Sequence, residues 1–330
     1  MSLVTRLTQK LGLEHPVISA PMALAAGGAL AAAVSNAGGL GLIGGGYGDQ
    51  VWLDDQFRAA GNARVGCGFI TWSLKKQPHL LDLILEKEPA AVFLSFGDPS
   101  DFAVRIARSG VCLICQIQTA RDAEVALDCG AQVIVAQGGE AGGHGEKRGT
   151  VALVPEIADL LARRAPQTLL CAAGGIADGR GLAASLMLGA DGVLVGSRFW
   201  ASKEALVHAN MHKAALTASG DDTIRSSVMD IARHLDWPSR FTARVLKNAF
   251  TRRWHGRENE LVADATLQSA QWRQAWADGN TDVANTFVGE AVGLIDAIDP
   301  AGVVLERMVE QAETLLSKTS KMIAAPSAAR

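Results

Sequence analysis

The stretch of the chain best suited to chemistry is QGGEAGGHG, residues 137–145. It places Gln137, Glu140 and His144 among five glycines. An imidazole titrates near pH ~6.5, so His144 can accept a proton from a carbon acid when neutral, or hydrogen-bond an oxygen of the substrate when protonated. Glu140 either orients that imidazole or caps the next helix. Because glycine lets the main chain lie close to a ligand, the stretch predicts a ligand-covering loop with His144 as its catalytic residue.

The elements that position this loop follow a repeating pattern of apolar runs and amphipathic helical stretches. The runs are residues 15–22, 39–46, 64–71, 90–97, 111–118, 131–139, 167–175 and 191–199. They are mostly apolar rather than alternating, which is typical of parallel strands covered on both faces. Eight strand–helix units in succession predict an α/β protein with a (β/α)8 TIM barrel. An open doubly wound sheet is the competing architecture, but eight such units leave no obvious place for an edge.

The pattern changes after the eighth strand. Residues 201–285 carry charged helical stretches and no strand signal, so they predict a helical insertion, or second lobe. We expect the barrel to span 1–212, the helical lobe over the pocket 213–285, a C-terminal helix returning to the barrel 286–320, and a flexible tail 321–330.

Glycine-rich segments follow the seventh and eighth strands. These segments are AAGGI (172–176) and VGSRF (195–199). In a barrel of this kind the active site lies at the carboxyl ends of the strands, and the last two strands commonly bind a phosphate through main-chain amides. The two segments together therefore predict a phosphate-bearing ligand. Arg198 either faces that phosphate or pairs with an outer carboxylate.

Composition limits the class of protein. The chain has 330 residues, 48% of them hydrophobic, and a formal net charge of −3, which gives no general electrostatic case for binding nucleic acid. No secretory signal or membrane-spanning run is evident, so we expect a cytoplasmic protein with no membrane partner.

Neither the cysteines nor the histidines predict a metal site. The five cysteines lie mostly in apolar runs and read as reduced core residues. Cys112 and Cys115 have CxxC spacing, but in a strand their side chains point to opposite faces. Glu204, His208 and His212 recur at four-residue steps, which is more typical of a solvated helix face than of metal ligands.

The ordered set of motifs resembles the nitronate monooxygenases, formerly called 2-nitropropane dioxygenases. The resemblance rests on HPVISAPMA near the start, QGGEAGGHG followed by GTVALVPEI, AAGGIADGRGLAASLMLGADGVLVGSRF, and the late FVGEAVGLI. It covers most of the chain and implies an FMN-dependent (β/α)8 enzyme with a flavin across the strand ends.

The resemblance also implies a set of cofactor-binding residues. The main chain of Ala20, Pro21 and Met22 would flank the isoalloxazine ring, and Gln137 and Gly142 would contact the flavin or its ribityl chain. The phosphate would be held by Gly174, Gly175, Gly196 and Ser197. His144 matches the active-site histidine of the family, and Gly68 stands where many members have an asparagine that touches the flavin.

Three functions remain open from the sequence. The first is FMN-dependent oxidation of alkyl nitronates, of the propionate 3-nitronate type, with O2 to a carbonyl product and nitrite, where His144 is the best candidate partner for the anion. The second is an FMN-dependent NAD(P)H reductase of the enoyl-acyl-carrier-protein or quinone type, since the sequences of those reductases resemble this one in the same motifs. The third is a non-catalytic flavin-binding protein. Expected partners are a small-molecule substrate and O2, and a homodimer is plausible.

Overall fold

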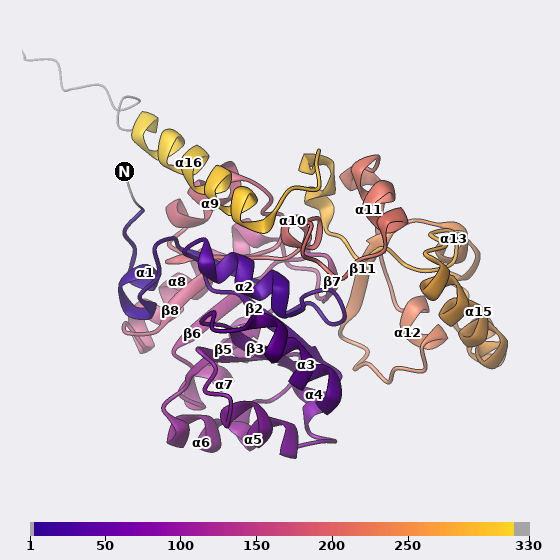
Figure 1. Cartoon of the computed structure of the whole chain (residues 1–330), viewed down its shortest axis with the longest axis horizontal. Helices are drawn as coiled ribbons and strands as arrows, with labels where there is room; N and C mark the ends of the chain where they lie inside the picture. Colours follow the sequence, from indigo (N-terminus) through magenta and orange to yellow (C-terminus); the bar gives the residue numbers. More distant parts are fainter. Residues whose placement is uncertain (1–2, 320–330) are drawn as a thin grey trace, which may run out of the picture.

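Eight parallel strands form the centre of the molecule. The computed structural model describes residues 3–319 and is shown in Figure 1. The strands are β1 (Val17–Ser19), β2 (Leu42–Gly46), β3 (Gly66–Ile70), β4 (Ala91–Ser95), β5 (Cys112–Ile117), β6 (Val133–Gln137), β8 (Leu169–Ala173) and β9 (Gly192–Val195). Each of the eight predicted apolar runs contains one of them.

The sheet curls round on itself into a barrel. Its strand order is β1-β9-β8-β6-β5-β4-β3-β2, and every pair is parallel. A parallel bridge between Ile18 and Leu40 brings the two ends of this order together. The predicted (β/α)8 TIM barrel is therefore confirmed.

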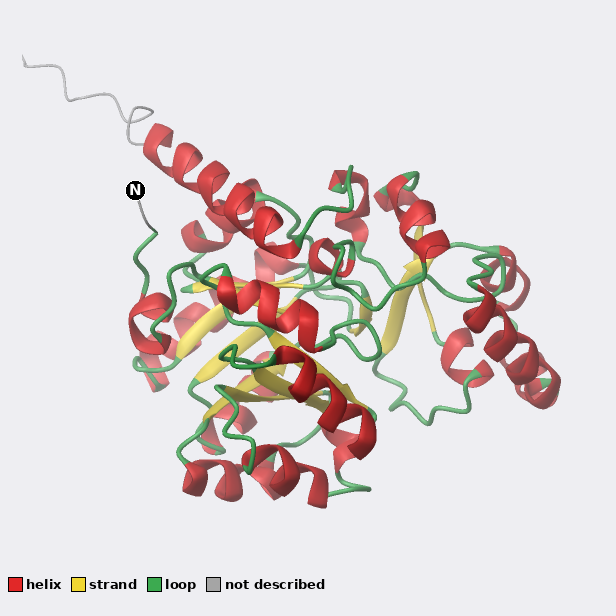
Figure 2. Ribbon diagram, in the orientation of Figure 1, coloured by secondary structure: helices red, strands yellow, loops and turns green. Residues whose placement is uncertain are grey.

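Helices surround the strands, as Figure 2 shows. After β1 to β6, β8 and β9 in turn come α2 (Gly28–Asn36), α3 (Gln50–Ala60), α5 (His79–Leu85), α6 (Ser100–Ser109), α7 (Ala120–Asp128), α8 (Thr150–Arg164), α9 (Gly179–Met187) and, after a long insertion, α16 (Ala301–Thr319). Two short helices, α1 (Arg6–Leu11) and α4 (Thr71–Leu74), complete this part. The last helix packs against α9 and α2, and so covers the first and last strands.

The core has two layers, one inside the barrel and one between strands and helices. Alternate residues of one strand belong to different layers, so Cys112 packs inside the barrel while Cys115 faces the helices. This confirms that the CxxC pair points to opposite faces. Burial raises the pKa of the Cys112 thiol to about 11, which keeps the thiol protonated and unreactive near neutral pH.

The insertion after β9 contains helices and a small sheet. Its helical elements are α10 (Ser197–Trp200), α11 (Ala209–Leu216), η1 (Gly220–Asp222), α12 (Val228–Ala232), α13 (Ala249–Trp254), α14 (Glu258–Ala263), α15 (Ala265–Asp278) and η2 (Glu290–Leu294). Of these, α11, α12, α13 and α15 lie at the right of Figure 1.

The expectation that residues 201–285 contain no strand is wrong. Strands β10 (Thr223–Ser226) and β11 (Thr242–Leu246) pair antiparallel with each other, and β11 pairs with β7 (Gly143–Gly145). Both insertion strands are short, and each contains an arginine, Arg225 or Arg244. The apolar run in each is therefore too short to predict a strand. The second partner of β11 is the glycine-rich loop itself, which carries no strand propensity of its own.

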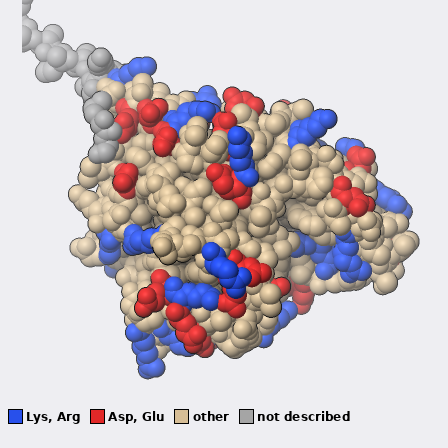
Figure 3. Space-filling view, viewed as in Figure 1, with Lys and Arg blue, Asp and Glu red and all other residues tan. Residues whose placement is uncertain are grey.

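The surface carries charges of both signs. On the face drawn in Figure 3, lysine and arginine are interspersed with aspartate and glutamate. No helix in the described part of the chain is long and apolar enough to cross a lipid bilayer.

Candidate active site

One large cavity lies at the carboxyl ends of the barrel strands, beneath the insertion. It encloses about 1430 Å³ of empty space, its open mouth included. Every residue predicted to form the site lines this cavity: Ala20, Pro21, Met22, Gly68, Gln137, Gly142, His144, Gly174, Gly175, Gly196 and Ser197. Strand ends far apart in the sequence therefore converge on one space.

His144 is held from several sides. Its main chain pairs with Ala243 of β11, and its carbonyl accepts a hydrogen bond from Gln137 Nε2 at 3.1 Å. The imidazole stacks on the indole of Trp237, with ring centroids 3.5 Å apart and planes 5° apart. Its Nε2 lies 2.9 Å from Asp230 Oδ2, and both side chains are buried. The ring is thus fixed in position and orientation.

Burial and the Asp230 carboxylate act on His144 in opposite directions. Burial is the largest effect and lowers the pKa of the imidazole below its ordinary value of 6.5, while Asp230 raises it. The imidazole is therefore neutral at pH 7. Since a carboxylate only accepts hydrogen bonds, Nε2 carries the hydrogen that Asp230 receives, and Nδ1 keeps its lone pair. This arrangement favours the proton acceptor among the two roles considered for His144.

Glu140 caps the next helix and does not orient the His144 imidazole. Both of its carboxylate oxygens accept from the Thr150 main-chain N–H, at 3.0 and 3.1 Å, and Thr150 Oγ1 donates to Oε2 at 2.8 Å. Thr150 is the first residue of α8, so the carboxylate satisfies the open N-terminus of that helix. The residue that orients the imidazole is Asp230, which the sequence analysis did not identify.

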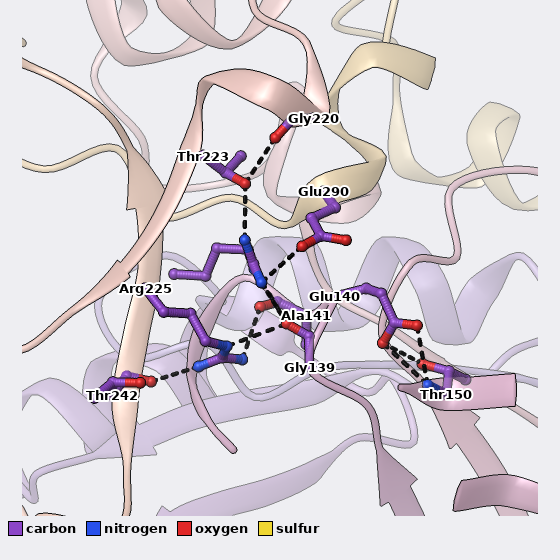
Figure 4. Close-up of polar contacts among 10 residues, drawn as sticks. Gly139, Glu140, Ala141, Thr150, Gly220, Thr223, Arg225, Thr242 and Glu290 are labelled. Carbon is purple, nitrogen blue, oxygen red and sulfur yellow. Dashed lines mark hydrogen bonds and ion pairs between the residues drawn. The ribbon is translucent and has the colours of Figure 1, made fainter. Parts of the chain in front are cut away.

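Two half-buried arginines hold the main chain of the glycine-rich loop (Figure 4). The Gly139 carbonyl accepts from Arg225 Nε at 3.2 Å and from Arg244 Nε and Nη2 at 3.1 and 3.0 Å. Arg225 also donates to the Thr242 carbonyl at 2.6 Å, and Arg244 pairs with Glu290 at 2.7 Å. We refer to Arg225 and Arg244 as the arginine clamp. It ties the loop to β10, β11 and η2.

Free main-chain amides gather at the ends of β8 and β9. Within residues 3–319, the N–H groups of Gly174, Gly175, Gly196 and Ser197 have no hydrogen-bond acceptor. Gly174 and Gly175 have φ angles of +102° and +74°, which glycine adopts without strain. A group of unpaired amides at neighbouring strand ends is suited to bind an anion.

Gly68 is forced by close packing. A Cβ at this position would lie 2.4 Å from Cγ of Pro21, so no side chain fits while Pro21 keeps its place. Glutamines form a separate polar cluster. Gln137 Oε1 accepts from Gln118 Nε2 at 2.7 Å and from Gln116 Nε2 at 3.2 Å. Gln116 also lines the cavity.

Arg198 points away from the free amides. It is buried, donates to the carbonyls of Ala201 and Ala297 at 2.9 and 3.1 Å, and lies 3.8 Å from Asp299. Of the two alternatives for Arg198, the structure therefore supports pairing with an outer carboxylate, Asp299, rather than facing the phosphate. Ser197 is oriented by the insertion, because its Oγ accepts from the Gly289 N–H at 2.8 Å.

The expectation that Glu204, His208 and His212 share one solvated helix face is wrong, because α11 begins only at Ala209 and His212 is half-buried. Glu204 accepts from the Ala301 amide, His208 caps α11, and His212 Nε2 lies 2.9 Å from the Trp200 carbonyl. No cluster of three potential ligands occurs in the part of the chain that the structure describes.

Several lining residues come from segments without a recognisable motif. They are Trp237 and Arg233 of the insertion and Tyr47 after β2. Trp72 packs behind Tyr47, with ring centroids 6.1 Å apart. The indole Nε1 of Trp237 donates to the Tyr47 hydroxyl at 3.1 Å, so these rings form one wall.

Comparison with known proteins assigns the chain to a family. The family model for nitronate monooxygenase matches residues 4–64 and 70–311. The chain belongs to the nitronate monooxygenase family. It is therefore an oxidoreductase, which disfavours the non-catalytic alternative.

Individual members of the family align along almost the whole chain. The nitronate monooxygenase of Neurospora crassa is 32% identical, over 92% of this chain and 91% of its own length. Nitronate monooxygenase npaC of Metarhizium robertsii is 34% identical, over 91% and 92%. Among solved structures, FabK of Thermotoga maritima superposes with a TM-score of 0.86 and 30% identity, covering 98% of this chain and 100% of FabK.

Proposed function

We propose that the protein is an FMN-dependent nitronate monooxygenase that converts alkyl nitronates, of the propionate 3-nitronate type, and O2 to a carbonyl product and nitrite. The observation that carries the proposal is the buried His144 imidazole, held by Asp230 and Trp237 on the wall of the cavity where the strand-end glycines meet. The family supports the same reaction class.

The residues of the cavity fit FMN. The four unpaired amides of Gly174, Gly175, Gly196 and Ser197 match a phosphate that needs hydrogen-bond donors. The loops of Ala20–Met22, Gly68, Gln137 and Gly142 offer main chain and small side chains for the faces and edge of a planar ring. When bound there, FMN supplies the redox chemistry, accepting electrons from the substrate and passing them to O2.

His144 acts on the substrate as a base. When a neutral nitroalkane enters, Nδ1 takes the proton on the carbon next to the nitro group. The C–H bond breaks, and its electron pair moves into the nitro group to give the nitronate. The resulting imidazolium is stabilised by Asp230 and can donate a hydrogen bond to a nitronate oxygen. A substrate that arrives as nitronate needs only this last contact.

The aromatic wall excludes water from the reacting atoms. Trp237 covers one face of the imidazole, and Phe96 and Phe241 pack against Trp237 with ring centroids 5.1 and 6.2 Å from it. A dry site strengthens the contact between an anionic substrate and its donors.

The test is O2 uptake and nitrite release by purified holoprotein with propionate 3-nitronate and with ethyl nitronate. We expect turnover with at least one nitronate, and a loss of about 10²-fold or more in kcat/KM for the parent nitroalkane in His144→Ala. His79→Ala is the matched control, since His79 is exposed on α5. Absence of O2 uptake with every nitronate would refute the proposed reaction.

A second candidate is an FMN-dependent NAD(P)H reductase. It is supported by the likeness to FabK over the whole chain and by the motifs shared with enoyl-acyl-carrier-protein reductases. Anaerobic mixing with NADH or NADPH separates the two candidates. Rapid bleaching of the visible flavin absorbance would favour the reductase, and an unchanged spectrum would favour the monooxygenase.

A further inference from the structure

Arg233 is the only lysine or arginine, within residues 3–319, that lines the cavity. It directly follows α12 and lies three residues after Asp230, so the two side chains leave the same short helix about one turn apart. The other charged residue of the lining, Glu140, is engaged by Thr150 at the start of α8. The cavity therefore offers a bound anion one permanent positive charge.

The guanidinium of Arg233 is fixed by aromatic rings rather than by a carboxylate. Its Cζ lies 5.3 Å from the ring centroids of Tyr47 and of Trp272, and 5.9 Å from that of Phe287. In the described part of the chain no carboxylate oxygen comes within 4.0 Å of its nitrogens. A partly buried charge without a counter-ion is unfavourable, whereas ring faces leave the edge of the guanidinium open for an anion.

The position of Arg233 relative to His144 indicates which part of a ligand it meets. Going outward from the imidazole, Trp237 stacks on His144, the Tyr47 hydroxyl accepts from Trp237, and Arg233 lies over Tyr47. The guanidinium is thus separated from the imidazole by ring contacts, on the same wall. A group bound by Arg233 is distinct from the carbon that His144 deprotonates.

We propose that Arg233 is a specificity-determining residue that binds a second anionic group, a carboxylate, on the substrate at a distance from the reacting carbon. This inference rests on the proposed function and assigns to Arg233 the contact with the carboxylate of a substrate of the propionate 3-nitronate type. A guanidinium fork matches the two oxygens of a carboxylate, and an apolar cavity with one cation discriminates against an uncharged chain end of the same length.

The test compares two unreactive ligands by calorimetry on the holoprotein. Succinate imitates a nitronate with a remote carboxylate, and butyrate has the same chain length without the second charge. We expect succinate to bind the parent protein about tenfold or more tightly than butyrate. In Arg233→Met we expect the two affinities to fall within about twofold of each other. A succinate preference that survives in Arg233→Met would overturn the inference.

Matched variants separate binding from packing. Arg253→Met is the control, because Arg253 also lies over an indole, 4.5 Å from the Trp254 ring centroid, but is exposed and does not line the cavity. Arg233→Lys keeps the charge without the fork, so its succinate preference should lie between those of the parent and Arg233→Met. If Arg233→Met does not fold, Arg233→Gln and Arg233→Lys decide the same question.

Kinetics distinguishes failure of this inference from failure of the proposed function. With propionate 3-nitronate, Arg233→Met should raise KM about tenfold and leave kcat within about twofold, and the rise in KM should be smaller with propyl 1-nitronate, which lacks the carboxylate. If neither nitronate is oxidised but succinate is still preferred through Arg233, the proposed reaction fails and the carboxylate site stands. If both nitronates are oxidised and the variant changes neither KM, the carboxylate site fails alone.

Discussion

Asp230 gives the His144 imidazole a defined tautomer. The carboxylate accepts the Nε2 hydrogen at 2.9 Å, and its other oxygen, Oδ1, is buried without a hydrogen-bond partner among the described residues. Because burial lowers the pKa of the imidazole while the carboxylate raises it, the pair keeps His144 neutral yet able to become protonated during turnover.

Asp230→Asn should test this pairing through the pH dependence of kcat/KM for nitroalkanes. A base must be neutral, so activity rises with pH through the His144 pKa, which lies below 6.5 in the parent protein. Removing the carboxylate removes the contribution that raises the pKa, so the acid limb should move to lower pH. The plateau should fall about 10- to 100-fold because the tautomer is no longer fixed. An acid limb that stays in place would contradict the pairing.

Gly68→Asn should test the packing beside Pro21. A side chain at residue 68 would meet the pyrrolidine ring at 2.4 Å, so the substitution should destabilise the protein by about 1–3 kcal/mol in chemical denaturation. Gly110→Asn is the control, since a Cβ there has nothing within 4 Å and asparagine tolerates its φ of +73°. Equal stability of the two variants would show that Pro21 shifts at little cost to make room for a side chain at residue 68, and would contradict the packing argument.

The strand-end glycines of the candidate site could be predicted from the sequence, but the side chains that the insertion contributes could not. Gly174, Gly175, Gly196 and Ser197 follow recognisable strands, and parallel strands bring their carboxyl ends together by topology alone. Asp230, Arg233 and Trp237 lie about 90 residues after His144 in a segment without a motif. Their approach to the imidazole depends on how β10 and β11 dock on the loop, which no local pattern encodes.

At the scale of elements, the three-stranded sheet of β10, β11 and β7 links the insertion to the barrel. The loop that carries His144 is the third strand of this sheet, and the arginine clamp fixes its Gly139 carbonyl. Residue propensities did not predict these strands, because the glycines and arginines in them disfavour a strand assignment. In the folded protein the same arginines donate hydrogen bonds to main-chain carbonyls of the loop.

Arg244→Met should loosen the loop without unfolding the barrel. It removes two of the three hydrogen bonds to the Gly139 carbonyl and the ion pair with Glu290. Hydrogen exchange of residues 138–145 should accelerate about tenfold or more, with strands β2 to β5 unchanged. Arg257→Met, which removes an exposed pair with Glu260, should leave exchange in the loop unaltered.

Helix α16 should contribute strongly to the stability of the barrel. Leu305 is fully buried between the helix and the barrel core, so Leu305→Ala should lower the free energy of unfolding by about 2–5 kcal/mol. Val303, on the same helix, is 40% exposed, and Val303→Ala should change it by less than about 0.5–1 kcal/mol. Similar effects of the two substitutions would indicate that α16 is not part of the cooperative core.

At the scale of the whole molecule, we propose that the barrel supplies main chain for the cofactor and the insertion supplies side chains for the substrate. The eight apolar runs sufficed to predict the barrel because a strand buried on both faces is continuously apolar. The proposed division at residues 212, 285 and 320 and the homodimer stay predictions, and the tail at 321–330 lies outside the described residues.

The most direct measurement of the central claim is the visible spectrum of the purified protein during anaerobic mixing with propionate 3-nitronate. We predict a yellow protein with FMN bound, whose flavin absorbance changes on addition of the nitronate and recovers when O2 is admitted, with nitrite released. A colourless protein that does not take up FMN, or a bound flavin that responds to NADH and not to the nitronate, would contradict it.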